Sequence, residues 1–335
     1  AARQGAKTAL VQDRPVLGGN ASKEMRVPPV GAANCNFAYS RETGIVEELY
    51  LNNLYRNPTW NWEGWNLEYE SLVRNEPNLD LFLNCAVCDV ITAESSPGIT
   101  ESSSHRVTAV KAHCPVAETW HVFHAPLFAD CSGDGVLGAL AGAAFRVGVE
   151  ARSEFDEPMC PEEATGDTMG MSLHMHARDA GRPMPFTRPA WVAMELSADD
   201  FGPYRPVCEQ FFPDTGGFWW LEWGGELDTV HDTLQIKDEV QRITLAVWDY
   251  LKNRSPLAEK LTTCELDWMG SVPAKRESRR FEGDHILTMG DIDGQVHFDD
   301  AVAYGGWGFD HHPPKGFYDK VNPSTHEYLR GPHNI

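Results

Sequence analysis

The 335-residue sequence contains no apolar run that approaches the roughly 18 residues needed to cross a membrane. It is also poor in basic residues, because 28 Lys and Arg stand against 49 Asp and Glu, for a formal charge of −21. Such a surface repels phosphate backbones and anionic lipids, so we expect neither a nucleic acid nor a membrane as partner. No signal-peptide pattern is visible, and the sequence assigns neither a localisation nor an oligomeric state.

Cysteine is present in 8 copies, but these are scattered and form no disulfide framework. Cys85 and Cys88 alone have the spacing of a redox or metal pair. They fall in an expected strand over residues 81–91, where positions three apart face opposite sides. A reactive pair normally lies at a helix N-terminus and a zinc site needs a second pair, so we predict core cysteines.

The most informative segment that is present is LVQDRPVLGGN, residues 10–20. A buried strand over residues 8–11 is followed by polar residues and a tight turn at two glycines, and residues 1–6 read as the exit of a helix. Helix, strand, polar edge and double glycine form the second half of a dinucleotide-binding βαβ unit. The first half, with its glycine-rich phosphate turn, is expected upstream of Ala1, which predicts a chain that begins in mid-domain.

Apolar spacing predicts one helix over residues 42–56, inside an otherwise irregular region. Further along the chain, strands are expected over three ranges: 79–93 (with a turn), 106–113 and 119–124. We expect a polar loop at 95–104, a short strand at 127–130 and a helix at 137–144.

The best later helix spans residues 237–252 and has an apolar stripe. The stripe consists of Val240, Ile243, Leu245, Val247 and Leu251. Residues 276–289 read as two strand-like halves around Gly283, and the chain is rich in loops after that point.

Five stretches resemble a known family, in the family's own order: residues 9–26, 128–152, 219–228, 247–253 and 270–291. Together they resemble the bacterial FAD-dependent oxidoreductases, which are built on the glutathione-reductase-type two-domain fold. The resemblance implies an α/β chain with an incomplete Rossmann-like FAD-binding domain, a small antiparallel β insertion, and a mixed α/β substrate (cap) domain. It also implies a fragment that lacks the N-terminal glycine-rich turn and the C-terminal segment that closes over FAD.

The same resemblance divides the chain into three parts. Residues 1–150 form the FAD-binding domain, with an irregular insertion at 28–75. Residues 151–275 form the substrate domain, and residues 276–335 contain a return segment toward the flavin followed by a loop-rich part.

The resemblance implies FAD as cofactor and gives roles to residues at the end of the first strand. The acidic residue that normally holds the ribose hydroxyls falls on Gln12. Either the Gln12 amide bonds the ribose or Asp13 replaces it, with Arg14 beside them; the alternative is a set of exposed strand-end residues.

The double glycine and two later segments complete the expected cofactor site. Gly18, Gly19 and Asn20 would pass close to the pyrophosphate and flavin, with Ser22 nearby as a donor, unless they form a plain surface turn. The main chain at Val87 would meet the adenine. In the turn formed by Ser132, Gly133 and Asp134, the Gly133 main chain would approach the cofactor. Asp134 either contacts the cofactor or caps the helix that follows.

Flavin performs the redox step itself, so the protein must place the substrate and steer protons. Arg276 and Arg280, with Ser278 between them, would face one side of a strand and concentrate positive charge. The alternative is a strand whose arginines pair with Glu277 and Glu282.

His311 and His312 are candidate proton acceptors, because histidine titrates near neutral pH. A solvated histidine pair in a proline-rich loop is the alternative. Residues 219–226 contain three tryptophans, which line either a sugar or aromatic site or the core, and Glu226 would be the polar member of such a site.

We therefore expect a flavin-dependent oxidoreductase that transfers a hydride from a small organic substrate to flavin N5, and the tryptophans suggest a carbohydrate or polyol. Two other classes stay open. One is an inactive fragment or a non-catalytic carbohydrate-binding or scaffold protein. The other is a metal hydrolase that uses His174 and His176, although no third ligand is evident near this pair and a structural role is favoured.

Overall fold

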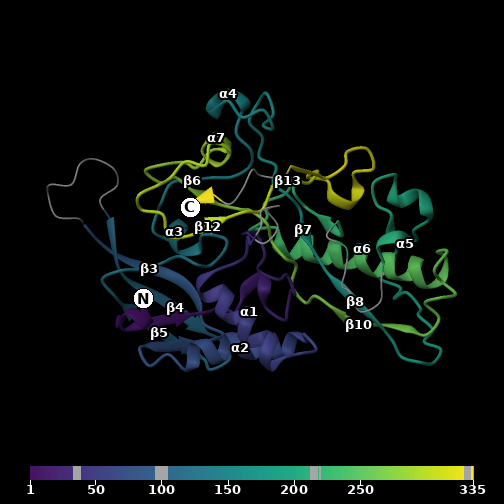
Figure 1. Cartoon of the computed structure of the whole chain (residues 1–335), viewed down its shortest axis with the longest axis horizontal. Coiled ribbons are helices and arrows are strands. Elements are labelled where there is room, and N and C mark those ends of the chain that lie inside the picture. Colours follow the sequence, from purple (N-terminus) through teal and green to yellow (C-terminus); the bar gives the residue numbers. More distant parts are fainter. Residues whose placement is uncertain (33–38, 95–104, 212–217, 219, 328–332, 335) are drawn as a thin grey trace. The chain divides into compact units, whose positions relative to one another are not determined.

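The computed structural model describes residues 1–32, 39–94, 105–211, 218, 220–327 and 333–334 (Figure 1). These residues form two compact units, each assembled from separate stretches of the chain. Unit 1 consists of Ala1–Lys23, Thr43–Arg146 and Arg279–Ile286. Unit 2 consists of Glu24–Glu42, Val147–Ser278 and Leu287–Ile335.

Unit 1 contains three helices and seven strands among the residues described. In chain order they are β1 (Thr8–Val11), α1 (Gly44–Arg56), α2 (Trp62–Arg74), β2 (Leu79–Phe82), β3 (Ala86–Glu94), β4 (His105–Cys114), β5 (Thr119–His124), α3 (Val136–Leu140), β6 (Phe145–Arg146) and β11 (Arg280–Phe281). A 3₁₀ turn at Ala2–Gln4 precedes β1, and a second one at Gly19–Ala21 follows it.

The sheets of unit 1 place the ends of β1 and β2 at one edge. β1 pairs in parallel with β2, from Thr8 opposite Leu79 to Val11 opposite Phe82. β3, β4 and β5 form an antiparallel sheet, which confirms the predicted strands at 106–113 and 119–124. The predicted loop at 95–104 lies outside the described residues.

Of the Cys85–Cys88 pair, only Cys85 lies in the core as predicted, and the prediction was wrong for Cys88. Cys85 is buried with Cys114 in the core of unit 1, whereas Cys88 is exposed, and all three thiols are free. Residues three apart along an extended chain face opposite sides, which is why the pair does not form a joint site.

The region expected to be irregular contains a second helix. Helix α1 confirms the helix predicted at 42–56, but α2 was missed, although it begins with an N-cap: the Asn61 side chain accepts a hydrogen bond from Gly64 N at 2.8 Å. Its aromatic residues Trp65 and Tyr69 are four apart and therefore lie on one face. α1 and α2 pack against each other in the lower part of Figure 1.

Two other predictions for unit 1 were wrong. Residues 127–130 form no strand, because Asp130 bonds its own loop and no described strand pairs with this segment. The helix predicted at 137–144 ends at Leu140, because the chain turns at Gly142, where φ is 80°.

Unit 2 contains the remaining elements, among them one long helix. In chain order they are α4 (Arg152–Phe155), β7 (Met171–Ser172), β8 (Met175–Asp179), α5 (Val207–Gln210), β9 (Glu222–Trp223), α6 (Thr233–Asn253), β10 (Cys264–Met269), α7 (Met289–Asp293), β12 (Tyr304–Gly305), β13 (Phe309–His311), β14 (Thr325–Glu327) and β15 (His333–Asn334). The strands associate in antiparallel pairs: β8 with β10, β7 with β9, β12 with β15 and β13 with β14.

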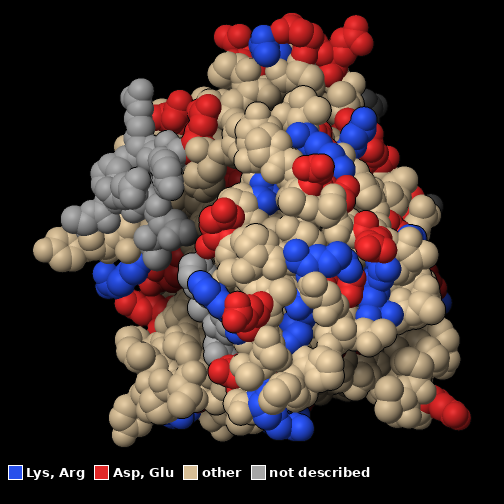
Figure 2. Space-filling view, turned by 90° about the vertical axis from the view of Figure 1, so that its right-hand side faces the viewer, with Lys and Arg blue, Asp and Glu red and all other residues tan. Residues whose placement is uncertain are grey.

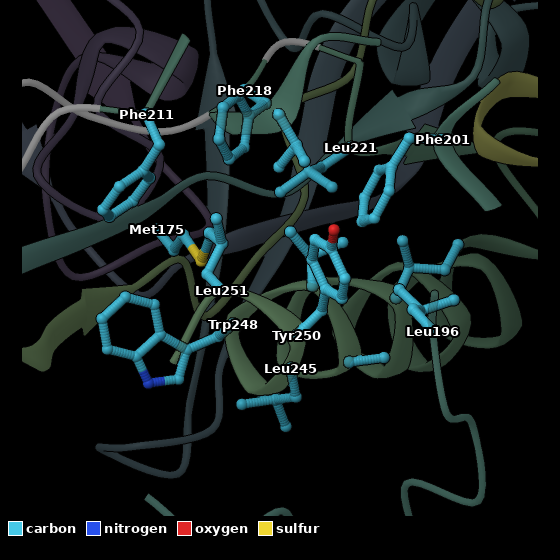
Figure 3. Packing of buried hydrophobic residues seen from close by; sticks show 14 of the residues in the cluster. Met175, Leu196, Phe201, Phe211, Phe218, Leu221, Leu245, Trp248, Tyr250 and Leu251 are labelled. Carbon is cyan, nitrogen blue, oxygen red and sulfur yellow. The ribbon is translucent and has the colours of Figure 1, made fainter. Parts of the chain in front are cut away.

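Helix α6 organises the core of unit 2. All five residues of its predicted stripe are buried. Around it pack side chains from several distant segments, among them Met175, Phe211 and Leu221, and Phe201 lies with its ring centroid 4.9 Å from that of Tyr250 (Figure 3). The helix is long because its apolar residues continue at helical spacing to its last turn.

The segment 276–289 was predicted incorrectly as two strand-like halves. Only Arg280–Phe281 is a strand, paired with Phe145–Arg146. The chain then enters α7, which begins with a capping box: Thr288 Oγ1 accepts from Asp291 N, and the Asp291 carboxylate accepts from Thr288 N.

The fold is therefore mixed α/β, with both parallel and antiparallel pairing. No helix in the described part of the chain is long and apolar enough to span a membrane. On the face drawn in Figure 2, basic and acidic side chains lie interspersed. Exposed ion pairs such as Arg178 with Glu265, at 2.7 Å, contribute little stability.

Candidate functional site

The Gly18–Gly19 turn of unit 1 combines a buried side with an open side. Both glycines have positive φ, 109° and 55°. A Cβ at Gly19 would meet nothing within 4 Å, and Asn20 is exposed, whereas Ser22 is fully buried. The turn therefore offers bare backbone to a ligand on one side and is anchored on the other.

The polar residues after β1 lie where the parallel strands β1 and β2 end. Gln12 N donates to Phe82 O at 2.8 Å, and Gln12 O accepts from Cys85 N at 2.8 Å. The Gln12 side chain donates to Val16 O at 3.2 Å, Asp13 is exposed, and Arg14 O accepts from Asn84 N at 3.1 Å. The carboxyl edge of parallel strands is where nucleotides bind in such folds.

The loop before α3 is organised by Asp130. Its carboxylate accepts hydrogen bonds from Ser132 N, Ser132 Oγ and Gly138 N. These bonds outweigh burial and lower the pKa of Asp130. Gly133 has φ 81° and open space at its Cβ position.

The predicted capping role of Asp134 is not what the start of α3 shows. The N-cap is Gly135, with no side-chain cap, and Val136 N donates to Ser132 Oγ at 2.8 Å. Asp134 instead uses its carbonyl to accept from Arg279 Nη1 at 3.0 Å. Val87 is half-buried in β3 opposite Ala112, so its side chain packs on the core, and its main-chain role toward adenine stays a prediction.

In unit 2, residues 171–175 alternate between apolar and polar side chains. Met171, Leu173 and Met175 are buried in the apolar clusters that include α6. Along an extended chain, Ser172 and His174 must face the opposite side. Apolar and polar side chains alternate here with a period of two residues, and this pattern in the sequence indicates a polar face on these strands.

Glu222 of β9 lies on the same polar face. It is directly opposite Ser172 in the β7–β9 pair and is completely buried. Its carboxylate accepts from Arg276 Nη2 at 2.9 Å and from His312 Nδ1 at 2.7 Å. Arg276 Nη2 also lies 3.3 Å from Ser172 Oγ. A buried carboxylate is stable only with such partners.

His312 lies between two carboxylates. Its Nε2 is 3.1 Å from Asp310 Oδ1, on the side away from Glu222. Burial favours the neutral imidazole, but the hydrogen bonds with Asp310 and Glu222 outweigh it and raise the pKa of His312 to about 9. The ring therefore holds both protons at neutral pH and donates from both nitrogens.

We call Ser172, Glu222, Arg276, Asp310 and His312 the buried charge cluster. It contains two cationic and two anionic side chains, drawn from four separate segments of unit 2. Chemically, it can hold fixed positive charge and donate hydrogen bonds to an electron-rich oxygen.

Two of the predicted chemical residues, Arg276 and His312, are thus brought together. Glu226 and His311 are exposed instead. Arg280 belongs to unit 1, where β11 pairs it with Arg146, and the expected strand face shared by Arg276 and Arg280 does not form.

Glu222 and Ser172 were not among the residues predicted from the sequence, whereas Asp310 lies within the segment 307–312 that contains the predicted histidines. Glu222 carried a signal, because a glutamate between Leu221 and Trp223 in an apolar run has to be buried with partners.

The tryptophans of residues 219–226 have structural contacts. Trp220 stacks on Phe218 and donates to Gln210 Oε1 at 2.8 Å, and Trp223 packs on the core. Trp219 lies outside the described residues.

The two histidines of the predicted pair differ in their surroundings. Burial, with the charges of His176 and Arg276, lowers the pKa of His174 to about 4. The His176 ring packs edge-on against Trp268 at 5.4 Å between centroids. No group of three or more His, Cys, Asp or Glu side chains suited to a metal ion occurs within the described ranges.

The family model for FAD dependent oxidoreductases matches residues 1–335, the whole chain. Comparisons with curated proteins and with solved structures gave no match. The match agrees with the glycine turns and parallel strand edge of unit 1, which suit a dinucleotide. The chain belongs to the FAD-dependent oxidoreductase family.

Proposed function

We propose that this flavoprotein oxidises a small organic substrate, and that the buried charge cluster binds and polarises the substrate oxygen. Family membership makes FAD the cofactor and implies a Rossmann-like FAD domain. The observation that carries the substrate part is the His312 side chain held between Glu222 at 2.7 Å and Asp310 at 3.1 Å.

The residues of unit 1 suit FAD in three places. Gly19 exposes backbone that a Cβ would cover, and Gly133 does the same in the loop before α3, whereas a Cβ at Gly18 would crowd Ser22 and Tyr69. Gln12 lies at the carboxyl end of β1, where its amide replaces the usual acid toward the ribose. We assign Asp13, Arg14, Asn20, Ser22, Val87, Ser132 and Asp134 to the same site as predicted contacts. When bound, FAD supplies the acceptor for a hydride at flavin N5.

The role of His312 follows from its charge. A ring that already carries two protons cannot accept another, so we assign it the role of fixed positive charge in place of proton acceptor. Arg276 uses Nη2 for Glu222 and Ser172, and its buried Nε has no hydrogen-bond partner among the described residues. We propose that this nitrogen donates to a substrate oxygen on which negative charge develops.

Arg280, His311 and Glu226 remain weaker candidates for the chemistry. Arg280 belongs to unit 1, and the other two are exposed side chains outside the buried charge cluster. A carbohydrate or polyol remains the candidate substrate class, because hydroxyl oxygens are suitable acceptors for an arginine donor. Trp220 and Trp223 pack on the core, so they do not support a carbohydrate site.

The test is anaerobic reduction of the bound flavin by a panel of polyols, sugars and hydroxy acids. Arg276→Gln should slow reduction about 100-fold or more with any substrate that reduces the wild type, because it removes a donor to developing charge. Arg178→Gln, an exposed arginine of the same unit, is the matched control.

Equal reduction rates in Arg276→Gln and wild type would refute the role of the charge cluster.

A further inference from the structure

We propose that Trp65, Asn66 and Tyr69 of α2 are positioning residues that hold the Gly18–Ser22 loop in the conformation that binds FAD. This inference rests on the proposed function, in which Gly18, Gly19 and Asn20 contact the cofactor. All the residues concerned belong to unit 1.

The first contact is a hydrogen bond from the helix to the loop backbone. Trp65 Nε1 donates to Ala21 O at 2.8 Å, and Trp65 is completely buried. The indole cannot shift, because the rings of Tyr50 and Trp60 both lie 5.1 Å from it between centroids. A buried carbonyl that loses its donor has no water to replace it.

The second and third contacts hold the two ends of the loop. Cε2 of Tyr69 lies 3.2 Å from the position that a Cβ would take at Gly18, so the ring closes the space behind this glycine. At the other end, Lys23 N donates to Asn66 Oδ1 at 3.2 Å, and Asn66 is buried. One helical turn of α2 therefore contacts the beginning, middle and end of the loop.

Two backbone hydrogen bonds close the turn of the loop itself. Ala21 N donates to Gly18 O and Ser22 N to Gly19 O, and these two bonds span only the turn itself. Two successive glycines with positive φ have many alternative conformations available to them. Restricting them before the ligand arrives reduces the entropy lost on binding, which increases affinity.

α2 is itself held in place by α1. The tilted Tyr50 ring of α1 contacts Trp65, and Arg56 pairs with the buried Glu68 at 3.1 Å. The region that was expected to be irregular thus supplies a rigid support for the loop.

The experiment measures FAD affinity and loop opening in Trp65→Phe. This substitution keeps a buried ring but removes the indole N–H. We expect FAD to dissociate about tenfold more readily, as measured by titration of FAD-free protein with FAD. Hydrogen exchange of the amides of residues 16–23 should be faster in the FAD-free variant.

Trp62→Phe is the matched control. Trp62 is in the same helix and contacts the Trp60 ring at 6.0 Å, but its indole donates no hydrogen bond to the described residues. It should bind FAD and exchange its loop amides as the wild type does. Should Trp65→Phe fail to fold, Tyr69→Leu removes the ring behind Gly18, and Tyr69→Phe retains it as the control.

The outcomes separate the two levels of inference. If the wild type binds no FAD, the proposed cofactor site fails, and the positioning role fails with it. If the wild type binds FAD and Trp65→Phe binds within twofold, the positioning role alone is overturned, whether or not loop exchange changes.

Discussion

Glu222 Oε1 accepts a hydrogen bond from His312 Nδ1 at 2.7 Å, and both side chains are buried in unit 2. The two residues are ninety positions apart in the sequence. The contact brings the segment after β13 onto β9, and Arg276 completes it from a third segment. Each partner compensates the charge of another. The free energy of unfolding should therefore change with pH and should fall when one member of the cluster is replaced.

The protonation of His312 predicts a pH dependence of stability. Its pKa in the folded chain is about 9, above the ordinary value of about 6.5. A raised folded-state pKa gives stability that is fully present below pH ~6.5 and is lost as the pH rises through ~9. The free energy of unfolding should fall by about 3 kcal/mol across this window.

The measurement is urea unfolding at several pH values, with His312→Gln as reference. The difference in unfolding free energy between wild type and variant should shrink from pH 6.5 to 9.5. A difference that does not change with pH would show that His312 is not protonated in the folded chain.

Glu222→Gln should destabilise unit 2 although it changes the side-chain shape little. The substitution leaves Arg276 and His312 with one remaining carboxylate, Asp310, so an uncompensated buried charge results. We expect a loss of about 3 kcal/mol in unfolding free energy, measured with urea at pH 7. Glu226→Gln makes the same chemical change at an exposed position and should cost no more than about 0.5 kcal/mol. Similar losses in the two variants would contradict the cluster as a stabilising unit.

Local pattern predicted those parts of the fold that depend on neighbours in the sequence. The stripe of α6 followed from helical periodicity, and the strand Thr8–Val11 followed from its short apolar run, although this strand is only partly buried and not buried as predicted. α2 was missed because its tryptophans, asparagines and glycine suggested a loop, whereas the Asn61 cap and the Trp65–Tyr69 spacing indicated a helix.

The candidate site is formed by contacts between residues far apart in the chain, and a single sequence does not reveal which of these residues meet. Arg276 and His312 were chosen for their chemistry, and the structure brings them together. The sequence analysis predicted Glu226 as a site residue, whereas the structure places Glu222, four residues earlier, in the cluster. The choice between them depends on the register of β9 against β7, which long-range packing sets and periodicity does not.

Gly316 should tolerate no side chain, because it packs directly on the backbone that carries Glu222. A Cβ at Gly316 would lie 2.2 Å from Glu222 O and 2.7 Å from Glu222 C. Gly181 has a similar φ, 66° against 53°, but open space at its Cβ position. Gly181→Ala should therefore cost only the left-handed backbone penalty of about 1 kcal/mol, whereas Gly316→Ala should cost about 3 kcal/mol or more. Thermal or urea unfolding measures the free energy lost in each variant. Equal losses in Gly181→Ala and Gly316→Ala would mean that the β9 backbone moves easily to make room for a Cβ.

Lys252 should act as a structural cation at the end of α6. Its ammonium group donates to Leu261 O at 2.5 Å, Thr262 O at 3.2 Å and Cys264 O at 2.8 Å, and the side chain is buried. All three donors are thus used to join the helix C-terminus to the start of β10, where the helix dipole also favours a cation.

Lys252→Met fills a similar volume but leaves these three carbonyls without their donor. We expect a loss of about 2 to 3 kcal/mol in unfolding free energy, because buried carbonyls without a donor are costly. Lys260→Met, at an exposed position in the same loop, should change stability by less than about 0.5 kcal/mol. A stabilised Lys252→Met variant would show that the desolvation penalty of the buried ammonium group exceeds the stabilisation from its three hydrogen bonds.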